Sequence, residues 1–237
     1  MEERRYESSP SYGFIRREYT RFNDTKLFPG KSYLYAIAKK IKLWYGTPIK
    51  GDNNLRTKVI LGIECEYKLL NGKIIKGDRH ISKLESDDII VKELELKDDD
   101  DFFTKFYICF DDIISYIKIE SFKGKILELG DCNNNLLKIA SFNDAKYPHI
   151  IQIFYGFKDD YGLRALGFKH VAKVFMLILK LIDILRLRHK IKKDNKIKEY
   201  WEDPNNYDKL DLVMKAIFKM ALLPDSPFST VFRFCVG

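Results

Sequence analysis

The chain has 237 residues, of which 46% are hydrophobic and 32% are charged, and its formal net charge is +8. This composition is that of a folded protein with a sizeable core. The positive charge suits an acidic partner, but acidic and basic residues are interspersed and form no basic stripe with regular aromatic spacing, which disfavours nucleic acid as a partner.

Cysteine usage and the lack of long apolar runs bear on the compartment. The four cysteines are widely spaced and include no C-x-x-C pair, which argues against a structural zinc site: Cys65, Cys109, Cys132 and Cys235. Cys65 and Cys109 lie within apolar alternation, so we expect buried thiols and reducing surroundings. The N-terminus lacks the apolar core of a signal peptide, and no uncharged apolar run reaches about 18 residues, so no transmembrane helix is expected. The sequence therefore predicts an intracellular protein that is not secreted.

Residues 1–30 are predicted to form an extended N-terminal arm. Ser8-Ser9-Pro10 and Pro29-Gly30 interrupt this segment, and its aromatic residues are interspersed with arginines without forming a periodic face. Such a segment rarely builds a core of its own, so one interpretation is a disordered tail. The other is an arm that docks its aromatic and arginine side chains in grooves of a partner, because these residue types dominate interface anchoring.

Residues 31–170 have a period of two, which predicts half-buried antiparallel strands. The alternation is clear at Ile41, Leu43 and Tyr45, and hairpin signals such as Lys123-Gly124 separate the runs. Three hairpins share one outline: 63–78, 117–131 and 150–169. The first two have Gly-Lys-Ile at the turn and Gly-Asp at the far end. Such a repeat predicts a pseudo-symmetric arrangement of sheets that close a shared core.

After residue 170 the period becomes helical, which predicts a C-terminal helical extension over 171–237. An amphipathic helix is expected at 171–191, ending in a basic cluster, and a second helix at about 207–222, stopped by Pro224. The apolar faces of these helices either pack on the protein's own core or bind a partner. The basic end of the first helix suits peripheral contact with an anionic membrane or an acidic protein surface.

The β-rich region resembles the jacalin-like β-prism domain of jacalin-related lectins. The resemblance lies in four stretches that occur in the family's order: Ile37 to Gly46, Ile63 to Gly77, Phe106 to Gly130 and Ile151 to Val171. They include the Gly-Lys hairpin turns and a terminal strand with Ala165-Leu166-Gly167. The resemblance implies a mainly β fold, a β-prism of three antiparallel Greek-key sheets with the first strand beside the last hairpin. The helical extension would be an addition to it.

The same resemblance implies where a sugar would bind. Sugar-binding members use a glycine-rich N-terminal segment and a G-x-x-x-D motif in the last hairpin, whose aspartate accepts hydrogen bonds from sugar hydroxyls. Here the N-terminal segment retains only Gly30 with its preceding proline, and the family register places Arg164 at the aspartate position. Arginine has donors and no acceptor, so it cannot replace that carboxylate.

A literal G-x-x-x-D occurs at Gly156 to Asp160, four residues too early for the family register. In a longer loop, Asp159 or Asp160 together with Tyr161 would still face a ligand. The candidate carbohydrate-binding residues are therefore Gly30, Asp159, Asp160, Tyr161 and Arg164.

No pattern in the sequence indicates catalysis or a bound metal. The four histidines are scattered, and no nucleophile elbow, phosphate loop or zinc-protease motif is present. The acidic run Asp98–Asp101 lacks the flanking pattern of a calcium loop, so we interpret it as a solvated loop. We expect no enzyme activity, no cofactor and no metal.

Two functional hypotheses follow. The favoured one is a non-enzymatic structural or accessory subunit of a large intracellular protein assembly, axonemal or mitochondrial, which uses the β-prism as an interaction module. Its N-terminal arm and C-terminal helices would contact the other subunits. The alternative is a carbohydrate-binding jacalin-related lectin, whose partner would be a glycan.

Overall fold

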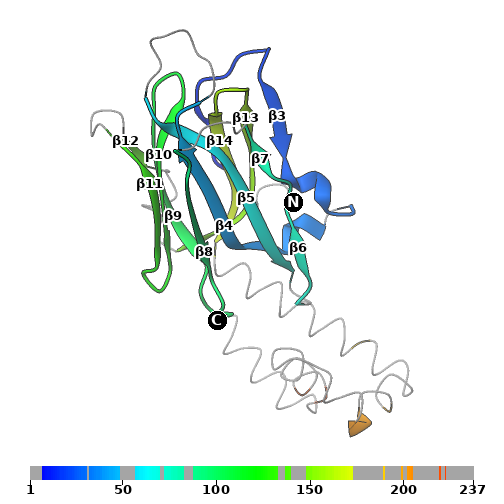
Figure 1. Cartoon of the computed structure of the whole chain (residues 1–237). Coiled ribbons are helices and arrows are strands. Elements are labelled where there is room, and N and C mark those ends of the chain that lie inside the picture. The colour runs from blue at the N-terminus through cyan, green and yellow to red at the C-terminus, as the bar shows by residue number, and fades with distance from the viewer. Residues whose placement is uncertain are drawn as a thin grey trace. The chain divides into compact units, whose positions relative to one another are not determined.

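The structure of the protein is a computed structural model. It describes residues 7–30, 32–48, 57–69, 72–82, 88–132, 137–139 and 148–172, and the isolated positions 189, 199, 202–204, 219 and 222. The chain divides into two compact units, Met1–Lys173 and Val174–Gly237. Nearly all described residues belong to the first unit, which is mainly β, as predicted (Figure 1).

The predicted helices at 171–191 and 207–222 lie outside the described residues, apart from isolated positions. Val171 and Ala172, expected to begin the first helix, instead end a strand. No helix among the described residues is long and apolar enough to cross a membrane.

One sheet joins the last hairpin to the N-terminal strands. Its order is β1-β14-β13-β3, and β2 also pairs with β14. The strands are β1 (Glu7–Ser8), β2 (Tyr12–Gly13), β3 (Thr20–Asn23), β13 (His149–Lys158) and β14 (Leu163–Ala172). All of these pairs are antiparallel. The described part of the segment that we expected to extend as an arm, residues 7–30, therefore pairs with the hairpin of its own unit.

A second sheet has the order β6-β5-β4-β8, with β7 also paired to β5. Its strands are β4 (Ala36–Gly46), β5 (Val59–Leu69), β6 (Ile74–Lys76), β7 (His80–Ile81) and β8 (Ile90–Glu95). Ile41, Leu43 and Tyr45 of β4 are buried, which confirms the predicted alternation. Two 3-10 helices precede this sheet, η2 (Asp24–Leu27) and η3 (Ser32–Tyr35).

The third sheet has the order β11-β10-β9-β12. Its strands are β9 (Phe103–Phe110), β10 (Ile114–Ser121), β11 (Ile126–Gly130) and β12 (Leu137–Ile139). The predicted turn at Lys123-Gly124 joins β10 to β11, and Gly124 has a positive φ of 83° that suits a tight turn.

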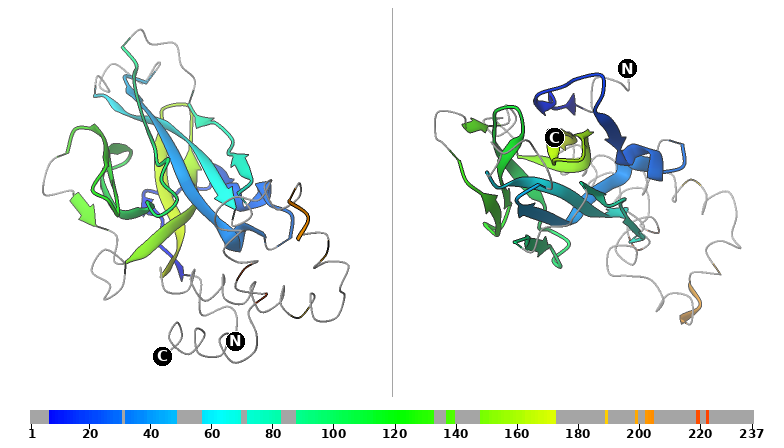
Figure 2. Two further views of the ribbon diagram at one scale, coloured as in Figure 1. Left: turned by 90° about the horizontal axis from the view of Figure 1, so that it is seen from below. Right: turned by 45° about the horizontal axis from the view of Figure 1, so that its top comes forward.

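The inner faces of the three sheets share one core. Figure 2 shows the sheets on different sides of a common interior. Large apolar side chains from all three sheets meet in a single buried cluster, including Phe168, Ile41 and Phe106. The ring centroids of Phe106 and Phe168 lie 5.0 Å apart in a T-shaped contact between the first and third sheets. The first unit therefore has the three-sheet prism that the resemblance implies.

Buried polar contacts fasten the N-terminal segment to the second sheet. Asp24 is buried, and its two carboxylate oxygens lie 2.5 Å from the Nε2 of His80 and 2.5 Å from the hydroxyl of Tyr67. Phe22 of β3, two residues before Asp24, stacks on the His80 ring with the ring centroids 4.0 Å apart. These contacts satisfy a carboxylate that would be costly to bury without partners.

Candidate ligand-binding site at the loop of the last hairpin

The loop between β13 and β14 is a tight turn organised by Asp159. Its Oδ1 accepts hydrogen bonds from the backbone N–H groups of Tyr161 at 2.9 Å and Gly162 at 3.2 Å. This is the local bonding by which aspartate favours turns. Gly162 has a φ of 153°, which suits glycine, and its carbonyl accepts from the Asp159 N–H at 3.1 Å.

Arg164, the first outward-facing residue of β14, closes the loop with an ion pair. Its Nε lies 2.7 Å from the Oδ2 of Asp159, and its Nη1 donates to the carbonyl oxygen of Asp112 at 3.1 Å. The side chains of Arg164 and Asp159 are only 13% and 18% exposed, so water screens this pair less than it screens a surface pair. The position where the resemblance implies an aspartate is thus occupied by a cation, which Asp159 holds in place.

Two tyrosine rings flank the Arg164 guanidinium. Its central carbon lies 5.2 Å from the ring centroid of Tyr19 and 5.7 Å from that of Tyr161. These distances suit cation–π contact. Tyr19 comes from the N-terminal segment and Tyr161 from the loop, so both ends of the first unit contribute to one cluster.

The N-terminal segment reaches this cluster through Gly13. Residues Tyr12 and Gly13 pair with Leu166 and Ala165, and the next N–H donates to the carbonyl oxygen of Arg164 at 3.0 Å. Gly13 has a φ of 127°, and a Cβ there would overlap the Arg164 carbonyl oxygen. Only glycine permits so close a backbone approach.

The structure brings together some of the predicted site residues and separates one. Asp159, Tyr161 and Arg164 contact one another, and Asp160 is exposed in the same loop. Gly30 does not join them, because the chain moves away from the loop along β3.

The pairing of β3 with β13 shows why Gly30 is separated from the loop. Thr20 pairs with Lys158 beside the loop, whereas Asn23 pairs with Tyr155, farther along β13. Beyond that point, the carbonyl oxygen of Leu34 accepts a hydrogen bond from the side chain of Gln152. The segment that contains Gly30 therefore follows the part of β13 remote from the loop.

Sequence reasoning missed Gly13, Tyr19 and Asp112 as parts of this site. The signal for Gly13 was present, since it is a glycine of the N-terminal segment, where the family resemblance implies one. No sequence signal marks Asp112, because it contributes only its carbonyl oxygen.

The cluster is richer in available donors than in available acceptors. Arginine has five N–H groups, and Arg164 uses two of them, which leaves three without a protein partner among the described residues. Asp159, in contrast, accepts three hydrogen bonds, two from backbone N–H groups of its own loop and one from Arg164 of β14. A ligand here would meet guanidinium donors and tyrosine rings, with the exposed Asp160 at the rim.

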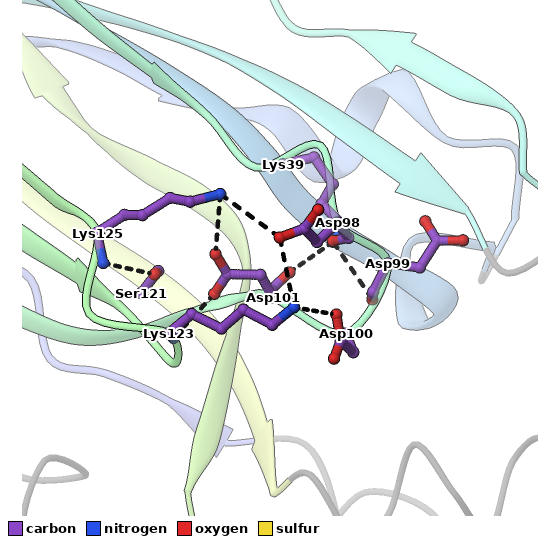
Figure 3. Close-up of polar contacts among 8 residues, drawn as sticks. All are labelled: Lys39, Asp98, Asp99, Asp100, Asp101, Ser121, Lys123 and Lys125. Carbon is purple, nitrogen blue, oxygen red and sulfur yellow. Dashed lines mark hydrogen bonds and ion pairs between the residues drawn. The ribbon is translucent and has the colours of Figure 1, made fainter.

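The acidic run Asp98–Asp101 forms a separate polar cluster, drawn in Figure 3, around the buried side chain of Lys39. The Lys39 ammonium donates to the carbonyl oxygens of Asp98 at 2.7 Å, Asp99 at 3.4 Å and Asp101 at 2.5 Å. Lys39 is the extra residue of a β-bulge in β4, which redirects a side chain. Burial lowers the pKa of Lys39, although the charge of Asp99 opposes this effect.

The prediction of a solvated acidic loop is wrong for Asp101, which is fully buried. Its Oδ1 accepts from the Lys123 N–H at 3.1 Å, and its Oδ2 lies 3.5 Å from the Lys125 ammonium. Lys123 also pairs with Asp100 at 2.6 Å. The carbonyl oxygens of the loop thus satisfy the buried ammonium of Lys39, which would be costly to bury without acceptors. Lys123 and Lys125 pair with the loop's carboxylates.

The cysteines also depart from expectation. Cys109 of β9 is disulfide-bonded to Cys132, with their Cα atoms 5.6 Å apart. The prediction that Cys109 is a free thiol is therefore wrong. Cys65 is a buried free thiol, which confirms that prediction, and burial raises its pKa. Among the residues that the structure describes, no three His, Cys, Asp or Glu side chains are grouped to hold a metal ion.

The chain was compared with family models, curated proteins and solved structures. No family model and no curated protein sequence matches the chain. Solved structures that resemble it are jacalin-related lectins. Frutapin, a lectin from Artocarpus incisa, is 16% identical with a TM-score of 0.49, covering 70% of this chain and 97% of its own.

Two further similar structures are a mannose-binding lectin from champedak and artocarpin complexed with methyl α-mannose. The champedak lectin is 18% identical with a TM-score of 0.48, covering 70% of this chain and 97% of its own. Artocarpin is 18% identical with a TM-score of 0.49, covering 70% and 98%. At these identities the likeness concerns the fold alone. By its own three antiparallel sheets, with N-terminal strands beside the last hairpin, the first unit has a β-prism fold.

Proposed function

We propose that the protein is a non-enzymatic glycan-binding module of the lectin type, with its ligand at the β13–β14 loop. The observation that carries the proposal is the convergence of Tyr19 and Tyr161 on the Arg164 guanidinium, at the place where the family resemblance expects a sugar. Aromatic rings beside a few oriented polar groups are the chemistry of small-ligand sites.

The proposed recognition differs from that of a carboxylate-based sugar loop. The three remaining N–H groups of Arg164 would donate to sugar oxygens, and the exposed Asp160 would accept from a hydroxyl. Asp159 would act indirectly, by fixing the guanidinium and the turn. The expected ligand is therefore a sugar that presents acceptor oxygens toward β14.

Calorimetric titration of the intact protein with simple glycosides, guided by a glycan array, tests this function. Tyr161→Ala and Arg164→Met are expected to weaken binding at least tenfold. The matched control is Tyr107→Ala, because Tyr107 is a partly exposed tyrosine of β9 that also stacks with a cation, Lys118. Binding to no glycan, or binding that both loop variants retain, would contradict the proposal.

A second candidate is a protein-interaction module, as in the structural-subunit hypothesis. It is favoured by two exposed apolar side chains that follow β2, Phe14 and Ile15, which are 43% and 51% exposed. Phe14 lies next to the candidate site, since its N–H donates to the carbonyl of Arg164. A native preparation that is monomeric, with no stable protein partner, would count against this candidate and leave the glycan proposal untouched.

A further inference from the structure

Two histidines face each other at the end of the last hairpin that is remote from the loop. His149 begins β13, and His170 lies on β14, opposite Ile151. Their Nδ1 atoms are 2.8 Å apart, which is hydrogen-bond distance. His170 is only 3% exposed and contacts the ring of Phe168 at the edge of the shared core. The partner His149 is half-buried.

This geometry limits how many protons the pair can hold. A hydrogen bond between two imidazole nitrogens needs one proton between them, with one ring donating and the other accepting. When both rings are protonated, two N–H donors and two positive charges face each other. Such an arrangement is unfavourable in a buried site, so the contact cannot survive full protonation.

The surroundings favour the neutral form of His170. The pKa of His170 is lowered from 6.5 to about 4, mainly by burial and in addition by the charge of His149. In the sheet, His170 pairs with Glu7 of β1, and Lys169 precedes it on β14. The Lys169 ammonium lies over the ring of Tyr33, at 4.7 Å.

We propose that the His149–His170 pair is a proton-sensitive latch, which holds this end of the β1–β14–β13 sheet closed at neutral pH and releases it on acidification. β1 contains only two residues, and one of them pairs directly with His170. Opening the latch therefore frees β1 and the strand ends together. The inference is independent of the glycan proposal, because the pair lies at the opposite end of the hairpin.

The direction of the pH effect on stability follows from the lowered pKa of His170. Because the folded-state pKa of His170 lies below its unfolded value, the stabilisation is complete above pH 6.5 and is lost as the pH falls toward 4. One proton changes an opening equilibrium by about tenfold per pH unit in this window. Between pH 6.5 and 4.5, local opening should increase by about fortyfold, because His170 is already half protonated in the open state at pH 6.5 and partly protonated in the closed state at pH 4.5.

Hydrogen exchange read by mass spectrometry on the full chain tests the latch, after correction for the intrinsic effect of pH. Peptides that contain β1 and the ends of β13 and β14 should exchange faster at pH 4.5 than at pH 6.5, while peptides from β4 and β5 should not. His170→Gln, whose amide forms hydrogen bonds without titrating, should remove this dependence. His189→Gln is the matched control and should keep it, since His189 is exposed in the second unit.

A second measurement does not depend on any variant. In the unaltered protein, the ring resonances of His170 should stay unshifted in nuclear magnetic resonance spectra until the pH falls below about 5. Titration of His170 near pH 6.5 would overturn the proposal. So would equal exchange at both pH values, or an acid response that His170→Gln retains.

Discussion

Arg164 and Asp159 form an ion pair across the mouth of the last hairpin, with the guanidinium Nε 2.7 Å from the carboxylate Oδ2. The same carboxylate holds the turn through its other oxygen. Asp159 therefore has two separable tasks, which substitutions can distinguish.

Asp159→Asn should destabilise the protein less than Asp159→Ala. Asparagine keeps an oxygen that accepts the turn N–H groups and loses only the ion pair, whereas alanine loses both. We expect a loss in the free energy of unfolding of about 1 kcal/mol for asparagine and about 2–3 kcal/mol for alanine. Urea denaturation measures both values, and equal losses would show that the turn bonds contribute nothing.

Gly13→Ala should disrupt the approach of β2 to β14. The Cβ would overlap the Arg164 carbonyl oxygen at a backbone conformation that alanine avoids. Gly124→Ala is the matched control, because Gly124 also has a positive φ but nothing lies within 4 Å of its Cβ position.

The control should lower the free energy of unfolding by about 1–2 kcal/mol, which is the backbone cost alone. Gly13→Ala should cost more, and it should also weaken glycan binding. Thermal unfolding and calorimetry measure the two effects, and equal stability losses in the two variants would contradict the steric argument.

Lys39→Met should be strongly destabilising. The variant leaves the carbonyl oxygens of Asp98, Asp99 and Asp101 without their shared donor in a site that is largely buried. We expect a loss of about 3 kcal/mol in the free energy of unfolding.

Lys105→Met is the comparison, since the side chain of Lys105 is 50% exposed and pairs with Glu120 at the surface. It should change stability by less than about 1 kcal/mol. A denaturation midpoint for Lys39→Met that matches that of Lys105→Met would refute the structural role of the carbonyl cluster.

Reduction of the disulfide between Cys109 and Cys132 should destabilise the first unit. The bond joins residues 23 positions apart, so it removes about 3 kcal/mol of loop-closure entropy from the unfolded chain. Alkylation of the unfolded protein, followed by mass spectrometry, should modify two more cysteines after reduction than before.

The native protein should also protect Cys65 from alkylation, because its thiol is buried and burial raises its pKa. Rapid modification of Cys65 without unfolding would contradict this burial.

The strands were the most predictable part of the molecule. Apolar alternation at Ile41, Leu43 and Tyr45 identified β4, and Lys123-Gly124 identified a hairpin turn. Both signals are local, because side-chain alternation and turn conformation depend on neighbouring residues. Recognition of the β-prism followed from several such hairpins in order.

The N-terminal strands could not be predicted in the same way. β1 and β2 contain two residues each, which is too short for any period to be seen. Their position depends on pairing with β14, a strand more than 150 residues away, through the register that joins Tyr12 to Leu166. The same long-range pairing of β2 with β14 brings Gly13 to the candidate site.

By itself the sequence determined the alternation of the strands, the hairpin turns and the presence of Arg164 where a sugar loop would need an acceptor. Only the tertiary structure decided what surrounds that arginine: the carboxylate of Asp159, the rings of Tyr19 and Tyr161, and the backbone at Gly13. It also decided that Lys39 lies inside the acidic loop and that Cys109 meets Cys132. The physical reason is that most of these contacts join residues distant in sequence, and packing of the three sheets on one core sets their positions. Asp159 and Tyr161 are near Arg164 in the chain, but the conformation of the β13–β14 turn decides that they contact it.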